Sequence, residues 1–158
     1  MIKAGDRIPS VTVRQVTDSG VQEINTADFF KGKRVALFAV PGAFTSTCSA
    51  KHLPSYVNNA EALRSKGVDA IVCTAVNDPA VMRAWGQAQK ADAVTMLSDG
   101  NGEFARALGV EADMLKHGMG HRSRRYSMVV ENGVVKQLNI EEPGAFGISG
   151  GDHMLTQL

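Results

Sequence analysis

Long apolar stretches alternate with segments of helical spacing along much of the chain. Arg34–Val40 and Val68–Val76 are apolar at almost every position, a pattern typical of central strands that are covered on both faces of a sheet. Thr95–Ser98 is a shorter stretch of the same kind. Because a helical segment follows each of these strands, the pattern predicts an α/β fold with parallel β-α-β units.

The helical segment after the first strand contains a proline. It runs from about Ser46 to Lys66, and Gly67 is placed to end it. Its apolar stripe consists of Leu53, Tyr56, Val57, Ala60 and Leu63. Pro54 removes a backbone hydrogen bond and clashes with the preceding turn, at roughly 3 kcal/mol in a regular helix. We therefore expect a kink or break near Pro54, between a first segment that carries Cys48 and a second segment at 55–66.

Turn and cap signals place the shorter elements. Further strands are expected at Ser10–Val13, Gln22–Asn25, Tyr126–Glu131 and Val134–Asn139, and further helices at Ala27–Phe30, Pro79–Gln89, Glu103–Leu108 and Asp152–Gln157. Thr26, Asp78 and Ser149 are the expected caps, the last in a capping box with Asp152. Residues 110–125 are polar and glycine-rich and predict no element.

The end of the chain completes the predicted topology. Asn132-Gly133 lies between two strands and is a strong signal for a tight β-hairpin. An antiparallel hairpin and a last helix after parallel β-α-β units are what a thioredoxin-like fold requires. We predict one such domain over residues 1–158, with a central mixed sheet flanked by helices.

Composition excludes several function classes. The chain has 158 residues, 44% of them hydrophobic and 21% charged, and its net charge of +1 gives no general attraction to nucleic acid or acidic membranes. No apolar run is long enough to span a bilayer, and the N-terminus lacks the apolar core of a secretory signal. Two cysteines form neither a disulfide framework nor a zinc motif, so we expect no metal and a reducing compartment. The cytoplasm is the simplest location, and an organellar form is the alternative.

Cys48 is the main candidate for chemistry. It follows the end of the first central strand and lies where a helix begins, and the unpaired N–H groups of a first helical turn favour thiolate over thiol. The competing interpretation is a small buried hydrophobic residue. Thr45 can supply a hydroxyl near the sulfur, and Pro41 can shield a thiolate from water. The flanking residues are small, so backbone amides can approach a small ligand; they are Gly42, Ala43, Ser46, Thr47 and Ser49.

The residues around Cys48 resemble a known family. Pro41-Gly-Ala-Phe-Thr-Ser-Thr-Cys48 is similar to the active-site segment of the peroxiredoxins, Pro-x-x-x-Thr-x-x-Cys. The longer string Val40–Pro54 resembles the type II, or peroxiredoxin 5, subfamily. Similar segments occur at Gly67-Val68, Val76–Pro79, Ala84-Trp85, Arg122–Tyr126 and Asn139–Glu141, so the resemblance covers nearly the whole chain.

The resemblance implies a thiol peroxidase that needs no metal, flavin or haem. Cys48 would reduce hydrogen peroxide and organic hydroperoxides and become a sulfenic acid. Thr45, Pro41 and an arginine would complete the catalytic group. Peroxide would contact Gly42, Phe44, Thr47 and His52, with the amides of Thr47 and Cys48 on the proximal oxygen. His52, four residues after Cys48, can face the thiolate or hydrogen-bond the backbone near Pro54.

Four cationic residues compete for the place beside the thiolate, namely His121, Arg122, Arg124 and Arg125. Alternation along the following strand sends Arg125 and Ser127 to one face and Arg124 and Tyr126 to the other. In the subfamily the catalytic arginine precedes the aromatic residue at the strand start, which implies Arg125. Its rigid fork of donors suits thiolate and peroxide oxygens together.

Cys73 has two interpretations. It can be a resolving thiol that attacks the sulfenic acid of Cys48, or a core residue, since alternation places Ile71, Cys73 and Ala75 on one face of a central strand. Animal members of the subfamily have the resolving cysteine in the glycine-rich segment before the last helix, and Gly147–Gly151 has none here. The resemblance therefore implies an external thiol, first glutathione with glutaredoxin and second thioredoxin.

Other functions remain open from the sequence alone. A homodimer is implied by the resemblance, with Phe44 and Pro79 at the contact. A thiol–disulfide oxidoreductase normally uses Cys-x-x-Cys, and Thr45 occupies the corresponding position here. A peroxide sensor would use oxidation of Cys48 to change partners instead of turning over peroxide.

Overall fold

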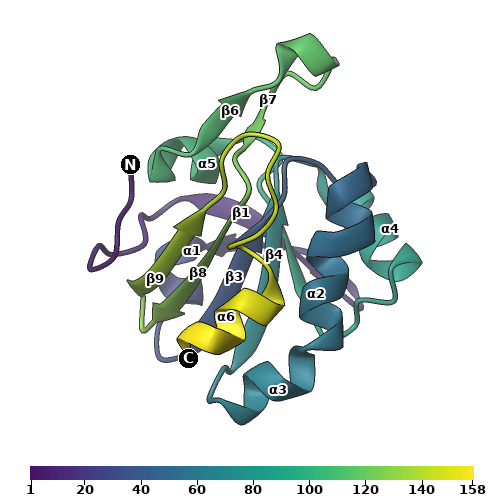
Figure 1. The fold of residues 1–158 in the computed structure, drawn as a ribbon. Helices are drawn as coiled ribbons and strands as arrows, with labels where there is room; N and C mark the ends of the chain where they lie inside the picture. The colour runs from purple at the N-terminus through teal and green to yellow at the C-terminus, as the bar shows by residue number, and fades with distance from the viewer.

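The computed structural model describes all residues, 1–158, and shows a seven-stranded mixed sheet with helices on both faces (Figure 1). The strand order is β2-β1-β5-β4-β3-β8-β9. The strands are β1 (Thr12–Thr17), β2 (Gly20–Asn25), β3 (Arg34–Ala39), β4 (Ala70–Ala75), β5 (Thr95–Ser98), β8 (Tyr126–Glu131) and β9 (Val134–Ile140). The central strands β3, β4 and β5 are parallel, and the outer ones are antiparallel. The α/β, thioredoxin-like prediction is confirmed.

The helices divide the interior into two apolar layers, one on each face of the sheet. They are α1 (Thr26–Phe29), α2 (Leu53–Asn58), α3 (Ala60–Ser65), α4 (Pro79–Ala88), α5 (Glu103–Leu108) and α6 (Gly151–Gln157). Helices α2, α3, α4 and α6 cover one face, where Cys48 and Cys73 are buried. Helices α1 and α5 cover the other face, together with the N-terminal segment. Because side chains alternate along a strand, β3, β4 and β8 supply residues to both layers, which explains their continuous apolar sequences.

The chain around Pro54 stays helical, but not as a regular α-helix. Residues 48–52 form a π-helix, η1 (Cys48–His52), which continues directly into α2. The Leu53 N–H donates to the Cys48 carbonyl, five residues earlier. The wider turn gives Pro54 room near the start of α2, where its missing N–H does less harm. The predicted irregularity is therefore a π turn before Pro54, and a second interruption, at Asn59, separates α2 from α3 and was not predicted.

Two predicted caps are wrong. Asn25 caps α1, because its side chain accepts from the Asp28 N–H, whereas Thr26 is the first helical residue and binds Pro9 and Val11 instead. The capping box at the last helix is also absent. Gly150 precedes α6 without a side-chain cap, and the Ser149 hydroxyl donates to Glu141.

The polar segment 110–125, in which no element was predicted, contains a second sheet. Strands β6 (Glu111–Asp113) and β7 (His121–Ser123) pair antiparallel, and a short 3-10 helix, η2 (Leu115–His117), lies between them. This hairpin projects from the body of the protein in Figure 1. Each strand has only three residues, too few for alternation to appear in the sequence.

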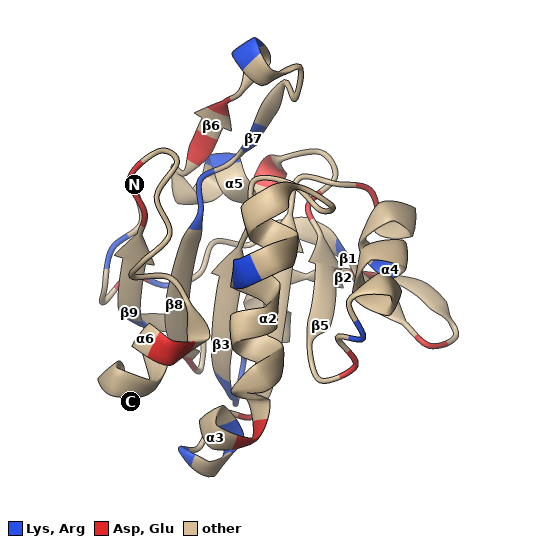
Figure 2. Cartoon of the chain, turned by 45° about the vertical axis from the view of Figure 1, so that its right-hand side comes forward, with Lys and Arg blue, Asp and Glu red and all other residues tan.

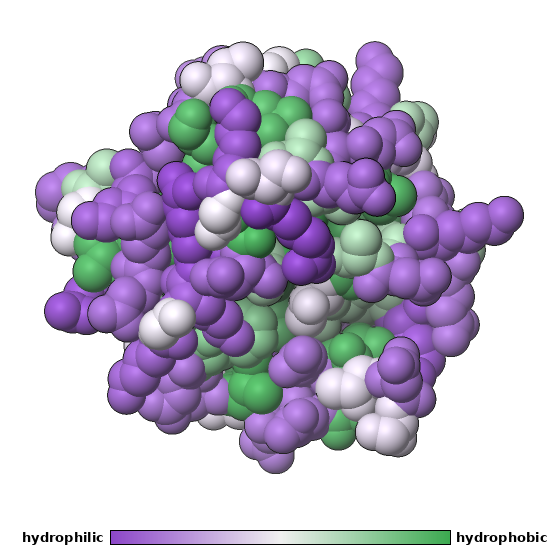
Figure 3. All heavy atoms as spheres, turned by 90° about the horizontal axis from the view of Figure 1, so that it is seen from below, coloured by the Kyte–Doolittle hydropathy of each residue, from purple (hydrophilic) through white to green (hydrophobic).

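Figure 2 shows both signs of charge distributed over the molecule. Figure 3 views the end opposite the β6–β7 hairpin, where hydrophilic residues interrupt the hydrophobic ones. None of the helices combines the length and the apolar character that crossing a bilayer requires.

Candidate active site

Cys48 and Arg125 meet where β3 and β8 lie side by side. Ala39, at the end of β3, pairs with Tyr126, the first residue of β8, so the chain after β3 and the chain before β8 share one edge of the sheet. The Arg125 Nη2 group donates to the Cys48 Sγ atom at 3.0 Å.

A fixed positive charge lies against the buried sulfur. The Cys48 side chain is 0% exposed, and an arginine that stays charged at any physiological pH contacts its sulfur. An adjacent positive charge stabilises a thiolate relative to a thiol, and more strongly where water is excluded. Cys48 also lies in the first helical turn, since residues 46 and 47 are already helical. The site can therefore hold a nucleophilic sulfur away from solvent.

His52 supports Arg125 instead of facing the sulfur. Its Nδ1 atom lies 2.8 Å from the Arg125 Nη1 group, and its Nε2 atom lies 3.0 Å from the Ser149 carbonyl oxygen. Since an arginine only donates and a carbonyl only accepts, the ring must be neutral with its proton on Nε2. Burial, helped by the charge of Arg125, lowers the pKa of His52 to about 3. Neither predicted role of His52, at the thiolate or at the backbone near Pro54, matches these contacts.

A second group of residues holds His52, and sequence reasoning did not find it. The Ser149 carbonyl accepts from both His52 and the Tyr56 hydroxyl, the latter at 2.7 Å. The backbone N–H and the hydroxyl of Ser149 donate to the Glu141 carboxylate. Tyr56 had been placed in the apolar stripe of the helix, and it also stacks on Phe38 with centroids 4.0 Å apart. The sequence signal for Glu141 was its place in the segment Asn139–Glu141, which resembles the peroxiredoxin 5 subfamily and lies at the end of the predicted strand.

The turn before Cys48 is held by its own contacts. The Thr45 hydroxyl donates to the Gly42 carbonyl at 2.7 Å, and the Ala43 N–H donates to the Asn77 side chain at 2.9 Å. A Cβ atom at Gly42 would lie 2.9 Å from the end of the Met119 side chain and 3.1 Å from that of Thr45, so a larger residue would require both side chains to shift. No hydrogen bond joins the Thr45 hydroxyl to the sulfur, and the hydroxyl oxygen keeps lone pairs for a ligand.

The other cationic candidates lie elsewhere. Arg124 donates to the Glu141 carbonyl at 3.2 Å. Arg122 donates to the Met119 and Val76 carbonyls and attaches the hairpin to the body. His121 is exposed and lies 3.8 Å from Glu111. Among the four, Arg125 is the one that contacts Cys48.

Cys73 lies in the middle of β4, between strand partners Phe38 of β3 and Met96 of β5. It is 0% exposed and carries a free thiol. Burial raises the pKa of the Cys73 thiol well above its ordinary value, the nearby Cys48 adds to this, and Arg125 opposes it. No hydrogen bond or ion pair involves its sulfur.

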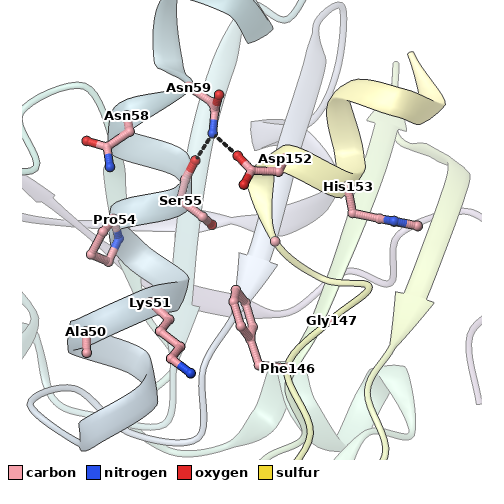
Figure 4. A pocket seen from close by; sticks show the side chains of 11 residues that line it. Ala50, Lys51, Pro54, Ser55, Asn58, Asn59, Phe146, Gly147, Asp152 and His153 are labelled. Atoms are coloured by element: carbon pink, nitrogen blue, oxygen red, sulfur yellow. Dashed lines mark hydrogen bonds between the residues drawn. The ribbon is translucent and has the colours of Figure 1, made fainter.

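A pocket of about 360 Å³ lies beside this site rather than over the sulfur (Figure 4). It opens between η1 and α2 on one side and the segment before α6 on the other, and it is lined mainly by polar residues, among them Lys51, Ser55, Asn58, Asn59 and Asp152. Phe146, also in its lining, packs against the His52 ring with centroids 5.1 Å apart. Nowhere do three His, Cys, Asp or Glu side chains gather as metal ligands would.

Comparison with known proteins identifies the family. The Redoxin family profile matches residues 3–148. The rice protein Peroxiredoxin-2E-2, chloroplastic, is 48% identical over 99% of this chain and 72% of its own length. Reduced Prx3 from Vibrio vulnificus, solved in complex with hydrogen peroxide, is 46% identical with a TM-score of 0.96 over 99% of both chains. Peroxiredoxin 5 from Alvinella pompejana is 36% identical with a TM-score of 0.87 over 99% of this chain and 97% of its own. The chain therefore belongs to the Redoxin family and, within it, to the peroxiredoxins of the type II or peroxiredoxin 5 group, which makes it a thiol peroxidase of antioxidant defence.

Proposed function

We propose that Cys48 is the peroxidatic residue, and the observation that carries this is the 3.0 Å contact between Arg125 and its buried sulfur. The thiolate attacks one oxygen of the peroxide, and a sulfur–oxygen bond forms as the oxygen–oxygen bond breaks. The second oxygen leaves with the electron pair and takes up a proton, which yields water from hydrogen peroxide and an alcohol from an organic hydroperoxide. Cys48 ends as a sulfenic acid.

The neighbouring residues have matching roles in this proposal. Arg125 stabilises the thiolate and then the charge that develops on the peroxide oxygens, which electrostatic catalysis requires. The Thr45 hydroxyl oxygen accepts a hydrogen bond from the peroxide O–H while the same hydroxyl continues to donate to the Gly42 carbonyl. In this proposal the turn 41–47 receives the peroxide, with Pro41 and Phe44 flanking it and the Thr47 amide donating to the proximal oxygen. Holding both reactants in line supplies much of the rate.

An external thiol reduces the sulfenic acid in this proposal. Two observations support it: Cys73 is enclosed in β4, and the segment 141–151 contains no cysteine. Glutathione with glutaredoxin is the first reductant to test, and thioredoxin is the second. Free thiols at both cysteines fit a reducing compartment, and we propose the cytoplasm.

A homodimer is part of the proposal as well. The Phe44 ring is 56% exposed beside the active site, although its φ of 64° is unfavourable for a bulky residue. Leu115, at the tip of the β6–β7 hairpin, is 62% exposed. Covering the ring of Phe44 with a second copy would explain why a large apolar side chain is held outward there. Sedimentation of the parent protein and of Phe44→Asp tests this, because the variant should be monomeric.

The decisive experiment measures turnover. With glutathione and glutaredoxin, and separately with thioredoxin, the parent protein should consume many equivalents of peroxide, whereas Cys48→Ser should consume none. Undiminished consumption by Cys48→Ser would exclude Cys48 as the reacting thiol. A peroxide sensor would instead oxidise once and stop with every reductant.

A further inference from the structure

Glu141 is a buried carboxylate, and one of its oxygens accepts several hydrogen bonds from the loop 147–149. Its side chain is 5% exposed, and its Oε2 atom accepts from the backbone N–H groups of Gly147, Ile148 and Ser149 at 2.8–2.9 Å. The Ser149 hydroxyl donates to the same oxygen at 2.7 Å. Burial alone would raise the pKa of Glu141, but these hydrogen bonds together lower it below its ordinary value. No lysine or arginine pairs with this carboxylate, so the loop itself stabilises the charge.

The loop in turn directs one carbonyl into the active site. With its N–H and hydroxyl on Glu141, Ser149 presents its carbonyl oxygen to His52 and Tyr56, both of which are buried. This carbonyl accepts the Nε2 proton of His52, which leaves the Nδ1 lone pair for Arg125. The guanidinium group of Arg125 therefore has one nitrogen on His52 and another on Cys48.

Glu141 is also joined to Arg125 through the backbone. Its N–H donates to the Arg125 carbonyl oxygen at 2.9 Å. Glu141 therefore contacts the main chain of Arg125 directly. It is connected to the guanidinium group of Arg125 through Ser149 and His52. This double connection is a feature of no other carboxylate in the protein.

We infer that Glu141 is a positioning residue for peroxide reduction, which sets the tautomer of His52 and the orientation of Arg125 through the Ser149 carbonyl. It touches neither the sulfur nor any atom that reacts. The inference rests on Cys48 being the reacting thiol, as proposed above. Loss of the carboxylate should leave the protein folded but allow the guanidinium group to move away from the sulfur.

A second set of contacts fixes the same segment of chain and supplies the control. On the other side of the loop, the Ser55 hydroxyl accepts from the Gly151 N–H. The Asn59 side chain donates to the Ser55 carbonyl and to Asp152 (Figure 4). These contacts bind the start of α6 to α2, but none of them involves the Ser149 carbonyl. Asn59→Ala therefore loosens the segment without touching the connection to His52.

The experiment compares four variants in the full-length protein. Glu141→Ala removes the acceptor, Glu141→Gln keeps a neutral one, Asn59→Ala loosens the segment, and Glu142→Gln changes an exposed neighbour with no side-chain hydrogen bond. The rate constant for peroxide can be followed through Trp85, the one tryptophan, whose indole N–H donates to Ser49 beside Cys48. Nitrogen NMR of the His52 ring reports the tautomer independently of the rate.

We expect Glu141→Ala to slow the reaction by about 10- to 100-fold, because misplacing a catalytic group by a fraction of an ångström to one ångström has effects of this order. Glu141→Gln should be intermediate, and both controls should react at the parent rate. The Nε2–H signature of His52 should be lost in Glu141→Ala and kept in Asn59→Ala.

Two results would overturn the inference: Glu141→Ala reacting at the parent rate, or a slow Glu141→Ala whose His52 tautomer is unchanged. Equal slowing in Asn59→Ala would also do so, since loop order alone would then be the cause. Failure of the proposed function looks different, because Cys48→Ser would then still consume peroxide.

Discussion

The two cysteines are equally buried and yet chemically unlike. Both are 0% exposed and both lie in the apolar layer under α2 and α4. Cys73 lies within a strand that is hydrogen-bonded on both sides, with Phe38 and Met96 as its partners. Cys48 lies just outside the sheet, on a π turn, with the Arg125 guanidinium group on its sulfur.

The difference shows that burial alone does not decide the reactivity of a thiol. Removing a thiol from water disfavours its charged form, which is why burial raises the pKa of Cys73. A fixed cation opposes this effect, and in this protein one contacts the sulfur that lies just outside the sheet. Inside β4 the backbone groups are used by the ladder and the neighbouring side chains are apolar, so no donor reaches the sulfur.

The largest predicted effect removes the cation. Arg125→Ala should slow peroxide reduction by about 10²- to 10³-fold, as expected when one donor to developing charge is lost. It should also make Cys48 resemble Cys73 in its slow reaction with alkylating reagents, because the thiolate loses its counter-charge. Stopped-flow measurement of both reactions checks this.

Arg124→Ala is the matched control for this prediction. Its side chain makes one hydrogen bond, to a carbonyl oxygen, and a bond of that kind contributes only about 1 kcal/mol, or roughly fivefold in rate. A loss in Arg124→Ala as large as that in Arg125→Ala would show that charge in this region, and not contact with the sulfur, distinguishes the two thiols.

A smaller predicted effect concerns pH and the neutral His52 that holds Arg125. The pKa of His52 is lowered from 6.5 to about 3 in the folded protein, so below pH 6.5 the unfolded chain binds a proton that the folded chain does not. The contribution of His52 to the free energy of unfolding is therefore constant above pH 6.5. It falls as the pH drops from 6.5 toward 3, by at most ~1.4 kcal/mol per pH unit. The pKa of Glu141 is lowered below its ordinary 4.5, so the stability that this ionised carboxylate contributes is lost only as the pH falls below 4.5.

Urea unfolding at pH 7 and pH 5 tests the contribution of His52 when the parent is compared with a His52 variant, because that comparison cancels other groups such as Asp99, whose pKa is raised by burial. His52→Gln keeps a donor and an acceptor but does not titrate there, so its stability should change less over this interval than that of the parent. Equal changes in the two proteins would show that His52 is not held neutral, and the support of Arg125 would need another origin.

Most of the fold, but only part of the active site, could be predicted from the sequence. The central strands were predictable because they are apolar on both faces, and Pro41–Cys48 marked the nucleophile because the motif is local. Alternation before β8 placed Arg125 and Arg124 on opposite faces, and the family resemblance then selected Arg125, which the structure places on the sulfur while Arg124 contacts the Glu141 carbonyl.

What could not be predicted depends on contacts between distant segments. The role of His52 is set by Ser149, 97 residues later, and no local pattern indicates that a backbone carbonyl will be presented there. The β6–β7 hairpin has strands too short for a periodic signal, and Ser149 resembled a helix cap because the capping-box spacing is also local. These errors arose because the local signal was either absent, as in the hairpin, or outweighed by a tertiary hydrogen bond, as at Ser149.

The smallest predicted effect on activity comes from Cys73, and it tests the other half of the comparison. Cys73→Ser should turn over peroxide with glutathione and glutaredoxin at nearly the parent rate, because no part of the proposed reaction uses this thiol. Its free energy of unfolding should nevertheless fall by about 1–3 kcal/mol, since serine buries a hydroxyl where no partner is available. Cys73→Ala separates that polar cost from the loss of volume. If Cys73→Ser instead forms the sulfenic acid and then stops, Cys73 is the resolving thiol, and β4 must open enough for a buried strand residue to reach the sulfur of Cys48.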